Sequence, residues 1–391
     1  MNATGGAAAA PRMHALISGA GVAGLALAGR LALDGWTVEI VERAPAPRES
    51  GYLIDFFGAG FDAAERLGLL PALRDRAESF EELRSIDSAG RVRAKLPISL
   101  VERAMAGRYL TIMRPRIIEV LLEALPETVR IRWGTQLETV HDDGGAVHML
   151  LSDGDRVRAD LLVGADGVGS RVRQLVWGPH RDFVRPVGGL LALAWIGGDA
   201  ALHADLQGRV AMQLERDRQL VVAPLGETGV TGFAVLRGVS PSDARRAIGE
   251  LGALGRRAVR GIRDPYIDEV AQTVVEPWVR GRVALLGDAC AAVSLLAGQG
   301  ASLAIAGAER LAEELAFAKR PSELHAGLAV YERDWRPIVE REQARGRRAQ
   351  ATFAPHTRLE LEAQRAVWRA AALPGVARLV ARAAGGVSKA H

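Results

Sequence analysis

One stretch, from Leu16 to Arg43, constrains the fold of this chain more than any other part of its sequence. His14 to Ser18 is a short apolar run of the kind that forms a buried parallel strand. The next segment carries apolar residues at helical spacing as far as Leu33, and Asp34-Gly35 ends it. A second apolar run then finishes at Glu42. The pattern predicts a strand, a helix and a second strand parallel to the first.

Three glycines at the start of this helix, Gly19-x-Gly21-x-x-Gly24, indicate what the unit binds. In such a turn the first glycine permits a tight bend, the second lets the backbone approach a pyrophosphate, and the third lets helix and strand pack closely. Free N–H groups at the helix start attract the anion. Glu42 ends the second strand, where a carboxylate accepts hydrogen bonds from a ribose hydroxyl and repels a 2′-phosphate. The sequence therefore predicts a dinucleotide site.

A second turn of this general type lies between Leu161 and Arg173. A buried apolar run leads into Gly164-Ala165-Asp166-Gly167, and an arginine-bearing helix follows. Turns of this kind place the acid and the glycine backbone against a ligand at the carboxyl end of a sheet. Asp166 also reads as an ordinary helix cap, so both interpretations stay open.

A third turn, Gly287-Asp288-Ala289, follows the apolar run from Val283 to Leu286. The glycine-rich loop 297–302 then begins a long helix that is expected to end near Phe317. A helix amino end after such a loop favours a polar or anionic group, and Asp288 is suited to hold a sugar-like hydroxyl chain. The chain is therefore expected to return here to its first sheet.

Between the second and third turns the sequence changes character. Four strand-like runs, with polar turns and no helix between them, predict an antiparallel sheet distinct from the parallel one: 190–196, 210–214, 220–223 and 230–236. A predicted hairpin at 83–96 joins this second lobe. Ser240-Pro241 is expected to cap a helix that ends near Arg257, and the chain is expected to leave the lobe at 270–275.

The remaining segments give coarser predictions. A small antiparallel meander is expected over 136–158, and 109–113 reads as a strand leading into a helix over 116–125. Arg114 at that junction can point into a cleft, and Arg48 in a proline-broken loop can reach a phosphate or ring edge. A solvated surface arginine is an equal alternative for both. The C-terminal part reads as helical with breaks at Pro355 and Pro374.

Composition limits the function classes. At 391 residues the chain can bury a sizeable core in two or three lobes. Its net charge of +4 is small for this length, so a nucleic-acid partner is not indicated. The single cysteine, Cys290, excludes an internal disulfide and is compatible with a reducing cytoplasm. Neither a signal peptide nor an apolar run long enough to cross a bilayer is found. We expect a cytoplasmic protein.

Three glycine-acid turns in this order, with an antiparallel lobe inserted between the second and third, resemble the single-component FAD-dependent monooxygenases of the para-hydroxybenzoate hydroxylase fold. The resemblance covers nearly the whole chain. It implies an α/β fold: a Rossmann-like FAD-binding domain, an inserted antiparallel β-sheet domain for substrate, and C-terminal helices. The corresponding boundaries are 12–80, 100–180 and 270–330 for the FAD-binding domain, 81–99 and 181–269 for the substrate domain, and 331–391 for the helical segment.

The resemblance also implies which residues contact the cofactor. They are Gly19, Gly21, Val22, Ala23, Gly24, Glu42, Arg43, Arg48, Arg114, Asp166, Gly167, Arg171, Gly287, Asp288, Gly298, Gln299, Gly300 and Ala301. The chain departs from the family pattern near the third turn. Cys290 and Ala291 replace the usual Ala-His, Leu295 replaces a proline, and Ser302 replaces a frequent asparagine. The roof over the flavin is therefore expected to differ from that of the better-known hydroxylases.

In such enzymes NAD(P)H is the co-substrate that reduces FAD, the reduced flavin takes up oxygen as a C4a-hydroperoxide, and one oxygen atom passes to an electron-rich ring or an olefin. The flavin carries the chemistry. No catalytic side chain is therefore assigned, and the scattered histidines show no metal-ligand spacing.

The expected substrate is a small hydrophobic, aromatic or polyketide-like molecule, and the expected assembly is a monomer or a homodimer. Candidate pocket residues, each of which also reads as plain core, are Tyr52, Ile54, Phe56, Met212, Leu214, Phe233, Leu295 and Leu296.

Other functions share parts of this pattern. A flavin-dependent halogenase is disfavoured, because Trp195-Ile196 does not fit the Trp-x-Trp-x-Ile-Pro segment of that family and the lysines lie far from the motifs. A saturating reductase of the geranylgeranyl type shares the fold and stays open. A non-catalytic FAD-binding protein is the alternative from another class, and a well-formed cavity above the flavin ring would count against it.

Overall fold

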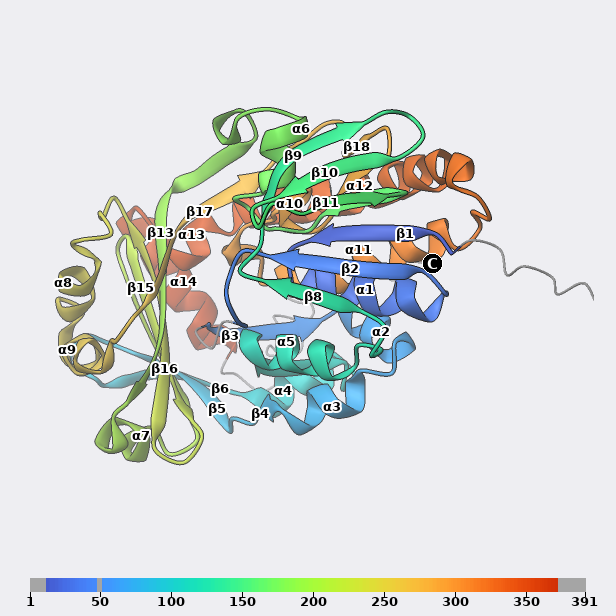
Figure 1. Ribbon diagram of the computed structural model, residues 1–391. Coiled ribbons are helices and arrows are strands. Elements are labelled where there is room, and N and C mark those ends of the chain that lie inside the picture. Colours follow the sequence, from blue (N-terminus) through green and yellow to red (C-terminus); the bar gives the residue numbers. More distant parts are fainter. Residues whose placement is uncertain (1–11, 48–50, 372–391) are drawn as a thin grey trace, which may run out of the picture.

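The computed structural model describes residues 12–47 and 51–371, and a six-stranded sheet forms its centre (Figure 1). The strand order is β18-β19-β12-β1-β2-β8, and neighbours are parallel except for β18 against β19. The strands are β1 (His14–Ser18), β2 (Thr37–Glu42), β8 (Arg130–Trp133), β12 (Leu161–Gly164), β18 (Val279–Arg280) and β19 (Val283–Leu285). The predicted parallel pairing of the first two strands is confirmed.

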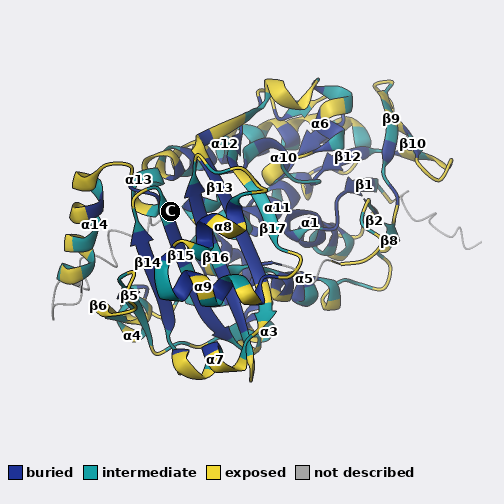
Figure 2. Ribbon diagram, turned by 90° about the vertical axis from the view of Figure 1, so that its left-hand side faces the viewer, coloured by how far each residue is buried: buried dark blue, intermediate teal, exposed yellow. Residues whose placement is uncertain are grey.

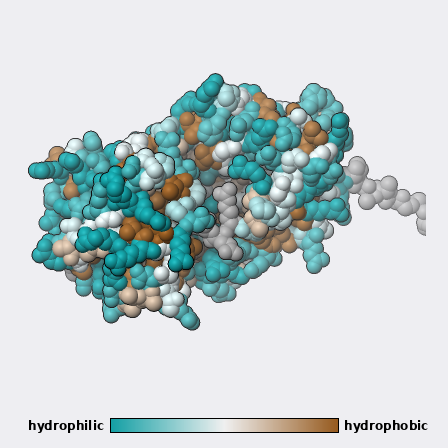
Figure 3. All heavy atoms as spheres, turned by 60° about the vertical axis from the view of Figure 1, so that its left-hand side comes forward, coloured by the Kyte–Doolittle hydropathy of each residue, from teal (hydrophilic) through white to brown (hydrophobic). Residues whose placement is uncertain are grey.

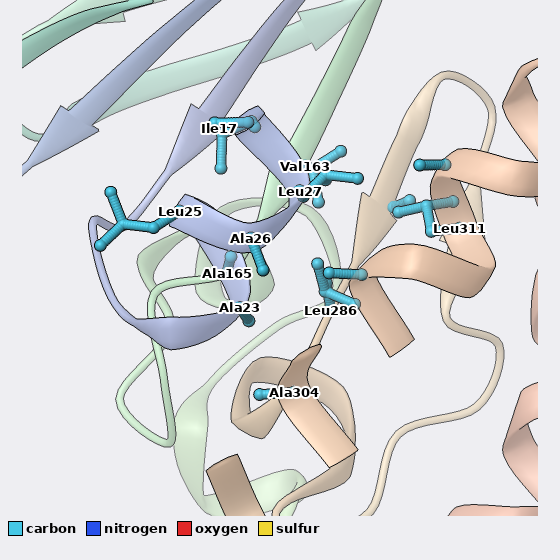
Figure 4. Packing of buried hydrophobic residues seen from close by; sticks show 14 of the residues in the cluster. Ile17, Ala23, Leu25, Ala26, Leu27, Val163, Ala165, Leu286, Ala304 and Leu311 are labelled. Carbon is cyan, nitrogen blue, oxygen red and sulfur yellow. The ribbon is translucent and has the colours of Figure 1, made fainter. Parts of the chain in front are cut away.

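Two helices pack together on one side of this sheet, α1 (Val22–Leu33) and α11 (Gly300–Leu315). Small side chains such as Ala23, Ala26 and Ala304 lie where the helices approach each other (Figure 4). The predicted meander is confirmed as a three-stranded sheet on the other side, and its apolar residues share the same core. Its strands are β9 (Leu137–Asp142), β10 (Val147–Leu151) and β11 (Arg156–Ala159).

The second lobe is a seven-stranded sheet of order β17-β13-β16-β15-β14-β5-β6, antiparallel except between β14 and β5. Its strands are β5 (Glu82–Ile86), β6 (Val92–Pro97), β13 (Val184–Gly198), β14 (Val210–Glu215), β15 (Arg218–Leu225), β16 (Gly229–Arg237) and β17 (Tyr266–Thr273). The predicted antiparallel lobe with the joined hairpin is thereby confirmed.

Alternation along β13 divides this sheet into two faces. Leu191, Leu193 and Trp195 pack outward against three helices, α7 (Ala200–Leu206), α8 (Ala244–Gly249) and α9 (Gly252–Gly261). Leu190 and Ala192 face the first lobe and pack with residues of the C-terminal half of the chain. Figure 2 shows the strands buried and the outer sides of α8 and α9 exposed.

Three predictions for this lobe are wrong. No helix was expected between the strand-like runs, but α7 lies between β13 and β14 because Asp199 caps a helical turn there. The run at 270–275 was expected to leave the lobe, but β17 pairs with β13 at the edge of the seven-stranded sheet. The reason is the length of β13, which passes through an irregularity between Pro186 and Leu191 and offers a long edge. The single helix expected after Ser240 is broken into α8 and α9. At the break Gly252 has φ +81°, and a Cβ there would collide with Ser88 O.

The other elements connect these layers. A three-stranded sheet of order β3-β7-β4 lies beside the main sheet, and its strands are β3 (Leu53–Phe57), β4 (Ala77–Glu78) and β7 (Tyr109–Met113). The remaining helices are α2 (Ala59–Arg66), α3 (Leu70–Asp75), α4 (Ile98–Ala104), α5 (Arg114–Glu123), α6 (Arg171–Val176), α10 (Asp288–Ala291), α12 (Leu324–Arg348), α13 (Gln350–Phe353) and α14 (Arg358–Ala371).

The C-terminal helices follow the predicted pattern in part. Pro355 lies in the break between α13 and α14, as expected, whereas Pro374 lies outside the described residues. Among the helices of residues 12–47 and 51–371, none combines the length and the apolar character needed to cross a membrane. The division of the chain into domains at the boundaries given above stays a prediction.

The pairing of Trp195 with Gly232 gives a stability test. The two residues face each other between β13 and β16, and a Cβ on Gly232 would collide with the indole ring of the buried Trp195. We expect Gly232→Ala to lower the free energy of unfolding by about 1–3 kcal/mol through overpacking. Equilibrium urea unfolding measures this. The control is Gly198→Ala on β13, where a Cβ meets nothing within 4 Å; equal losses in both variants would contradict the packing argument.

Candidate functional site

The three glycine-acid turns meet at the carboxyl ends of neighbouring strands, β1, β12 and β19. A Cβ on Gly19 would lie 2.6 Å from Ala165 O, and one on Gly287 would lie 2.9 Å from the Cβ of Ala23. The first turn is therefore in contact with both others, and at these two points only glycine fits. Segments far apart in the sequence form a single site at the sheet edge where α/β folds bind ligands.

The amino end of α1 has the features of an anion site. A Cβ on Gly24 would collide with Gly19 O, so helix and turn pack as closely as predicted. A Cβ on Gly21 would meet nothing within 4 Å, which leaves open space beside the helix start. No side chain caps the helix and no acid lies in its first turn. Within the described residues the N–H groups of Val22 and Ala23 have no acceptor, so they can donate to a pyrophosphate oxygen.

Glu42 is held beside this turn by backbone groups. Its two carboxylate oxygens accept hydrogen bonds from Ala20 N at 2.9 Å and Ala44 N at 2.8 Å. Each oxygen keeps acceptor capacity for a ribose hydroxyl. Arg43 is exposed, and Arg48 lies outside the described residues.

Asp166 accepts hydrogen bonds at the amino end of helix α6, whose N-cap residue is Ser170. Its carboxylate accepts hydrogen bonds from Arg171 N at 2.7 Å, Val172 N at 3.1 Å and the Ser170 hydroxyl at 2.5 Å. Burial raises the pKa of Asp166, and these hydrogen bonds oppose the shift. The capping interpretation therefore holds. A contact between Asp166 or its neighbour Gly167 and a cofactor stays a prediction.

Helix α6 carries two arginines, of which Arg171 was predicted to contact the cofactor and Arg173 was not. Arg171 donates to the carbonyls of Leu137 at 3.1 Å and Glu138 at 3.4 Å, so its side chain is directed to β9. Arg173, which sequence reasoning missed, is 0% exposed and donates to Ala289 O at 2.6 Å and Val168 O at 2.5 Å. It thereby joins the second turn to the third. Nothing in the sequence distinguishes these two arginines, because their burial depends on tertiary packing.

A cavity of about 450 Å³ lies beside the turns, between β3–β7, the inner face of the seven-stranded sheet and the loop before α11. Five of the predicted pocket residues line it: Tyr52, Ile54, Met212, Phe233 and Leu295. Residues predicted for the cofactor line it as well: Arg114, Asp288, Gly298, Gly300 and Ala301. Gln299 lies between Gly298 and Gly300 in the sequence and immediately precedes α11. Apolar residues gather near the middle of the face in Figure 3, between the two lobes.

Three predicted pocket residues do not line the cavity. Phe56 is fully buried against Phe61, because β3 has passed under α2 at that point. Leu214 lies farther along β14 than Met212, where Arg365 of α14 reaches its carbonyl at 3.5 Å. Leu296 packs into the core behind the loop. Alternation along the strands therefore predicted correctly which face of β14 and β16 lines the cavity, but it did not show where the cavity ends.

The charged groups near Arg114 in the cavity differ in whether they have hydrogen-bond partners among the described residues. The Asp288 carboxylate makes no hydrogen bond to any described residue and is exposed to the cavity. Surrounding protein raises the pKa of Asp288, Arg114 lowers it and Asp268 raises it further. Asp268 accepts a hydrogen bond from Tyr266 Oη at 2.8 Å. Burial raises the pKa of Tyr52 to about 12, so its hydroxyl stays protonated.

Two glutamines fix the loop that forms the cavity wall before α11. Gln343 Nε2 on α12 donates to Thr273 O at 2.7 Å and Ala292 O at 3.0 Å. Gln272 Nε2 donates to Val293 O at 3.0 Å. A Cβ on Gly346 would lie 2.5 Å from Val293 O, so α12 rests directly on this loop. These contacts could not be predicted from the sequence, because each joins segments that are distant along the chain.

The capping role of Asp166 is testable without any cofactor. Asp166→Ala leaves two N–H groups of α6 without acceptors, and we expect it to lower the free energy of unfolding by about 1–2 kcal/mol. Urea unfolding of the cofactor-free protein measures the change. Asp75→Ala, at an exposed position of α3, is the matched control. If Asp166→Ala unfolds at the same urea concentration as the control, the carboxylate does not stabilise the turn.

The comparisons with known proteins agree with this site. A family model described as FAD binding domain matches residues 12–183 and 258–345. An uncharacterized protein of Mycobacterium tuberculosis is 31% identical over 361 residues, covering 84% of this chain and 91% of the relative. Monooxygenase CTB7 of Cercospora beticola is 30% identical over 353 residues, covering 83% of each.

A solved structure also matches. Klebsiella pneumoniae HpxO complexed with FAD and uric acid aligns with a TM-score of 0.77 at 18% identity, covering 91% of this chain and 92% of HpxO. At that identity the match shows the fold. Together with the sequence matches and the convergence of the three turns, it assigns this chain to the FAD-dependent monooxygenases of the para-hydroxybenzoate hydroxylase fold.

Proposed function

We propose that this protein uses NAD(P)H and O₂ to hydroxylate or epoxidise a small hydrophobic, aromatic or polyketide-like molecule. The observation that carries the proposal is the cavity of about 450 Å³, which is lined by Val168 after β12, by Asp288 after β19 and by apolar residues of the second lobe. Such a cavity, in which apolar walls surround polar groups, is typical of a small-molecule site. It favours an enzyme over a non-catalytic FAD-binding protein.

The residues present fit FAD. Open space at Gly21 and the uncapped amino end of α1 suit a pyrophosphate, and the held carboxylate of Glu42 suits a ribose. We propose that the unpaired Asp288 accepts hydrogen bonds from the ribityl hydroxyls and that Arg114 borders the flavin ring. When bound, the flavin would supply the redox and oxygen-transfer chemistry.

The protein's own part is to bind, orient and exclude water. Met212, Phe233 and Leu295 present apolar surface to the cavity, and Tyr52 packs against Phe233 with ring centroids 5.9 Å apart. This wall suits a flat ring system. Uric acid, the compound in the HpxO structure, is a planar ring system, which is consistent with a substrate of this shape.

The proposed reaction is tested with protein reconstituted with FAD. We expect NADH or NADPH to reduce the bound flavin, and reoxidation by O₂ to show a transient absorbance that belongs to neither the oxidised nor the reduced flavin. Stopped-flow spectroscopy measures both steps, and ¹⁸O₂ labelling with mass spectrometry follows oxygen into aromatic test compounds. Reoxidation without a transient would favour a reductase. Failure to bind FAD would overturn the proposal.

Substitution of Asp288 is expected to affect FAD affinity and the stability of the cofactor-free protein differently. The raised pKa of Asp288 means that ionising this carboxyl is less favourable in the folded protein than in the unfolded chain, so the ionised carboxylate costs the cofactor-free protein stability at neutral pH. Asp288→Asn removes that charge and weakens a charge-assisted hydrogen bond to the cofactor. We expect the Kd for FAD to rise by roughly tenfold while the urea midpoint of the cofactor-free protein does not fall.

Flavin fluorescence titration and urea unfolding measure the two effects. Asp75→Asn, at an exposed site on α3, is the control and should change neither quantity. An unchanged Kd for Asp288→Asn would remove this residue from the proposed cofactor contacts.

A further inference from the structure

Three polar side chains lie together on the part of the cavity wall formed by β3 and β7. Tyr109 Oη donates to Asp55 Oδ1 at 2.6 Å. Thr111 Oγ1 lies 3.0 Å from the Tyr109 hydroxyl oxygen and 3.4 Å from Asp55 Oδ1. Asp55 and Thr111 are directly opposite in the β3–β7 pair, and all three residues line the cavity. We call them the acceptor cluster.

The hydroxyl groups of the acceptor cluster donate their hydrogen bonds to other members of the cluster. Tyrosine and threonine each carry one hydroxyl hydrogen, and an ionised aspartate carries none. Both hydroxyls point to partners inside the cluster, so no donor is left for the cavity. Asp55 Oδ2 receives no hydrogen bond from any residue in the described part of the chain. Toward the cavity the cluster therefore offers only acceptors.

The surroundings of the acceptor cluster strengthen its character as a hydrogen-bond acceptor. Burial raises the pKa of Tyr109 well above its usual value, with the charge of Asp55 adding to the shift, so the phenol stays a donor. Burial also raises the pKa of Asp55, whereas the two hydroxyls oppose that shift. Apolar side chains such as Leu83 and Ile98 line the cavity with the cluster. An acceptor in such surroundings gains more from a ligand donor than it would in open water.

The charges on the described lining residues also favour a ligand that donates hydrogen bonds. The described lining of the cavity includes four acidic residues, Asp55, Asp268, Glu269 and Asp288, and one guanidinium, that of Arg114. Such a cavity repels an anionic ligand unless a further cation neutralises it. A neutral or cationic donor is the complementary partner.

The acceptor cluster is also separated from the expected flavin position. Thr111 lies on β7, three residues before Arg114. Three residues of extended strand span about 10 Å. A group held at Asp55 is therefore about the length of a fused ring system away from Arg114. It would anchor the distal end of a substrate while the near end reacts.

We propose that Asp55 binds a hydroxyl or N–H donor at the distal end of the substrate and discriminates against a carboxylate there, with Tyr109 and Thr111 fixing the orientation of its carboxylate. The proposal rests on the proposed function, whose active-site cavity it refines. The substrate class is thus a planar apolar molecule that carries a hydrogen-bond donor remote from the oxidised atom.

The test uses the FAD-reconstituted protein and three probes of one ring system: 2-naphthol, 2-methoxynaphthalene and 2-naphthoate. Isothermal titration calorimetry measures their affinities. The wild-type protein should bind 2-naphthol roughly tenfold or more tightly than 2-methoxynaphthalene, since a hydrogen bond to a charged acceptor is lost in the second probe. Binding of 2-naphthoate should be weakest.

Asp55→Asn distinguishes recognition from a structural role. Tyr109 donates to Oδ1, so it holds the amide oxygen in place and turns the NH₂ group toward the cavity. The cavity then offers a donor in place of an acceptor. We expect 2-naphthol to lose roughly tenfold or more in affinity and 2-naphthoate to gain, which reverses the preference. Loss of packing would weaken all three probes together.

Two controls complete the experiment. Asp75→Asn, outside the cavity, should keep the wild-type preference. Asp55→Asn combined with Tyr109→Phe frees the amide to rotate, so the reversal should shrink. Equal affinity for all probes in the wild-type protein, including no measurable binding, or an unchanged preference in Asp55→Asn, overturns the proposal. FAD binding and NAD(P)H oxidation are measured on the same samples, so that failure of the proposed function is recognised separately.

Discussion

The structure depends on how closely three backbone turns approach one another. Gly19 lies against Ala165, Gly24 lies against Gly19, and Gly287 lies against Ala23, each at a distance that leaves no room for a Cβ. This contact holds the ends of β1, β12 and β19 in one place and sets the position of α1 and α10. Every other part of the cofactor site is arranged around it. The absence of three side chains is thus the condition for assembling the site.

The second constraint is the way the two sheets share a cavity. The parallel sheet ends in backbone N–H groups and carboxylates, whereas the inner face of the antiparallel sheet presents apolar side chains. The small sheet of β3 and β7 lies between them, with Arg114 at one end and Asp55 farther along. A cavity built in this way has different chemistry at its two ends. That difference is what the proposed function needs, because it pairs a charged cofactor with a largely apolar substrate.

Sequence reasoning predicted the features that short-range patterns encode. The unit from His14 to Glu42, the meander and the second lobe follow from apolar periodicity and turn residues, and the structure confirms them. Sequence reasoning could not predict the partner of β17 or the break at Gly252, because both depend on contacts with distant segments. Arg173 was missed for the same reason. Tyr109 and Thr111 could have been found, since alternation puts them on one face of their strand.

The contact between α12 and the cavity wall bears on how the protein is made. Ala292 and Val293 are held by Gln343 and rest against Gly346, so this wall takes its final position only when α12 is in place. During synthesis the first glycine turn leaves the ribosome long before these residues do. A nascent chain can therefore form the β1–α1–β2 unit early, yet its cavity stays incomplete until nearly the whole protein has emerged. Cofactor loading is in this sense a late event in the life of each new molecule.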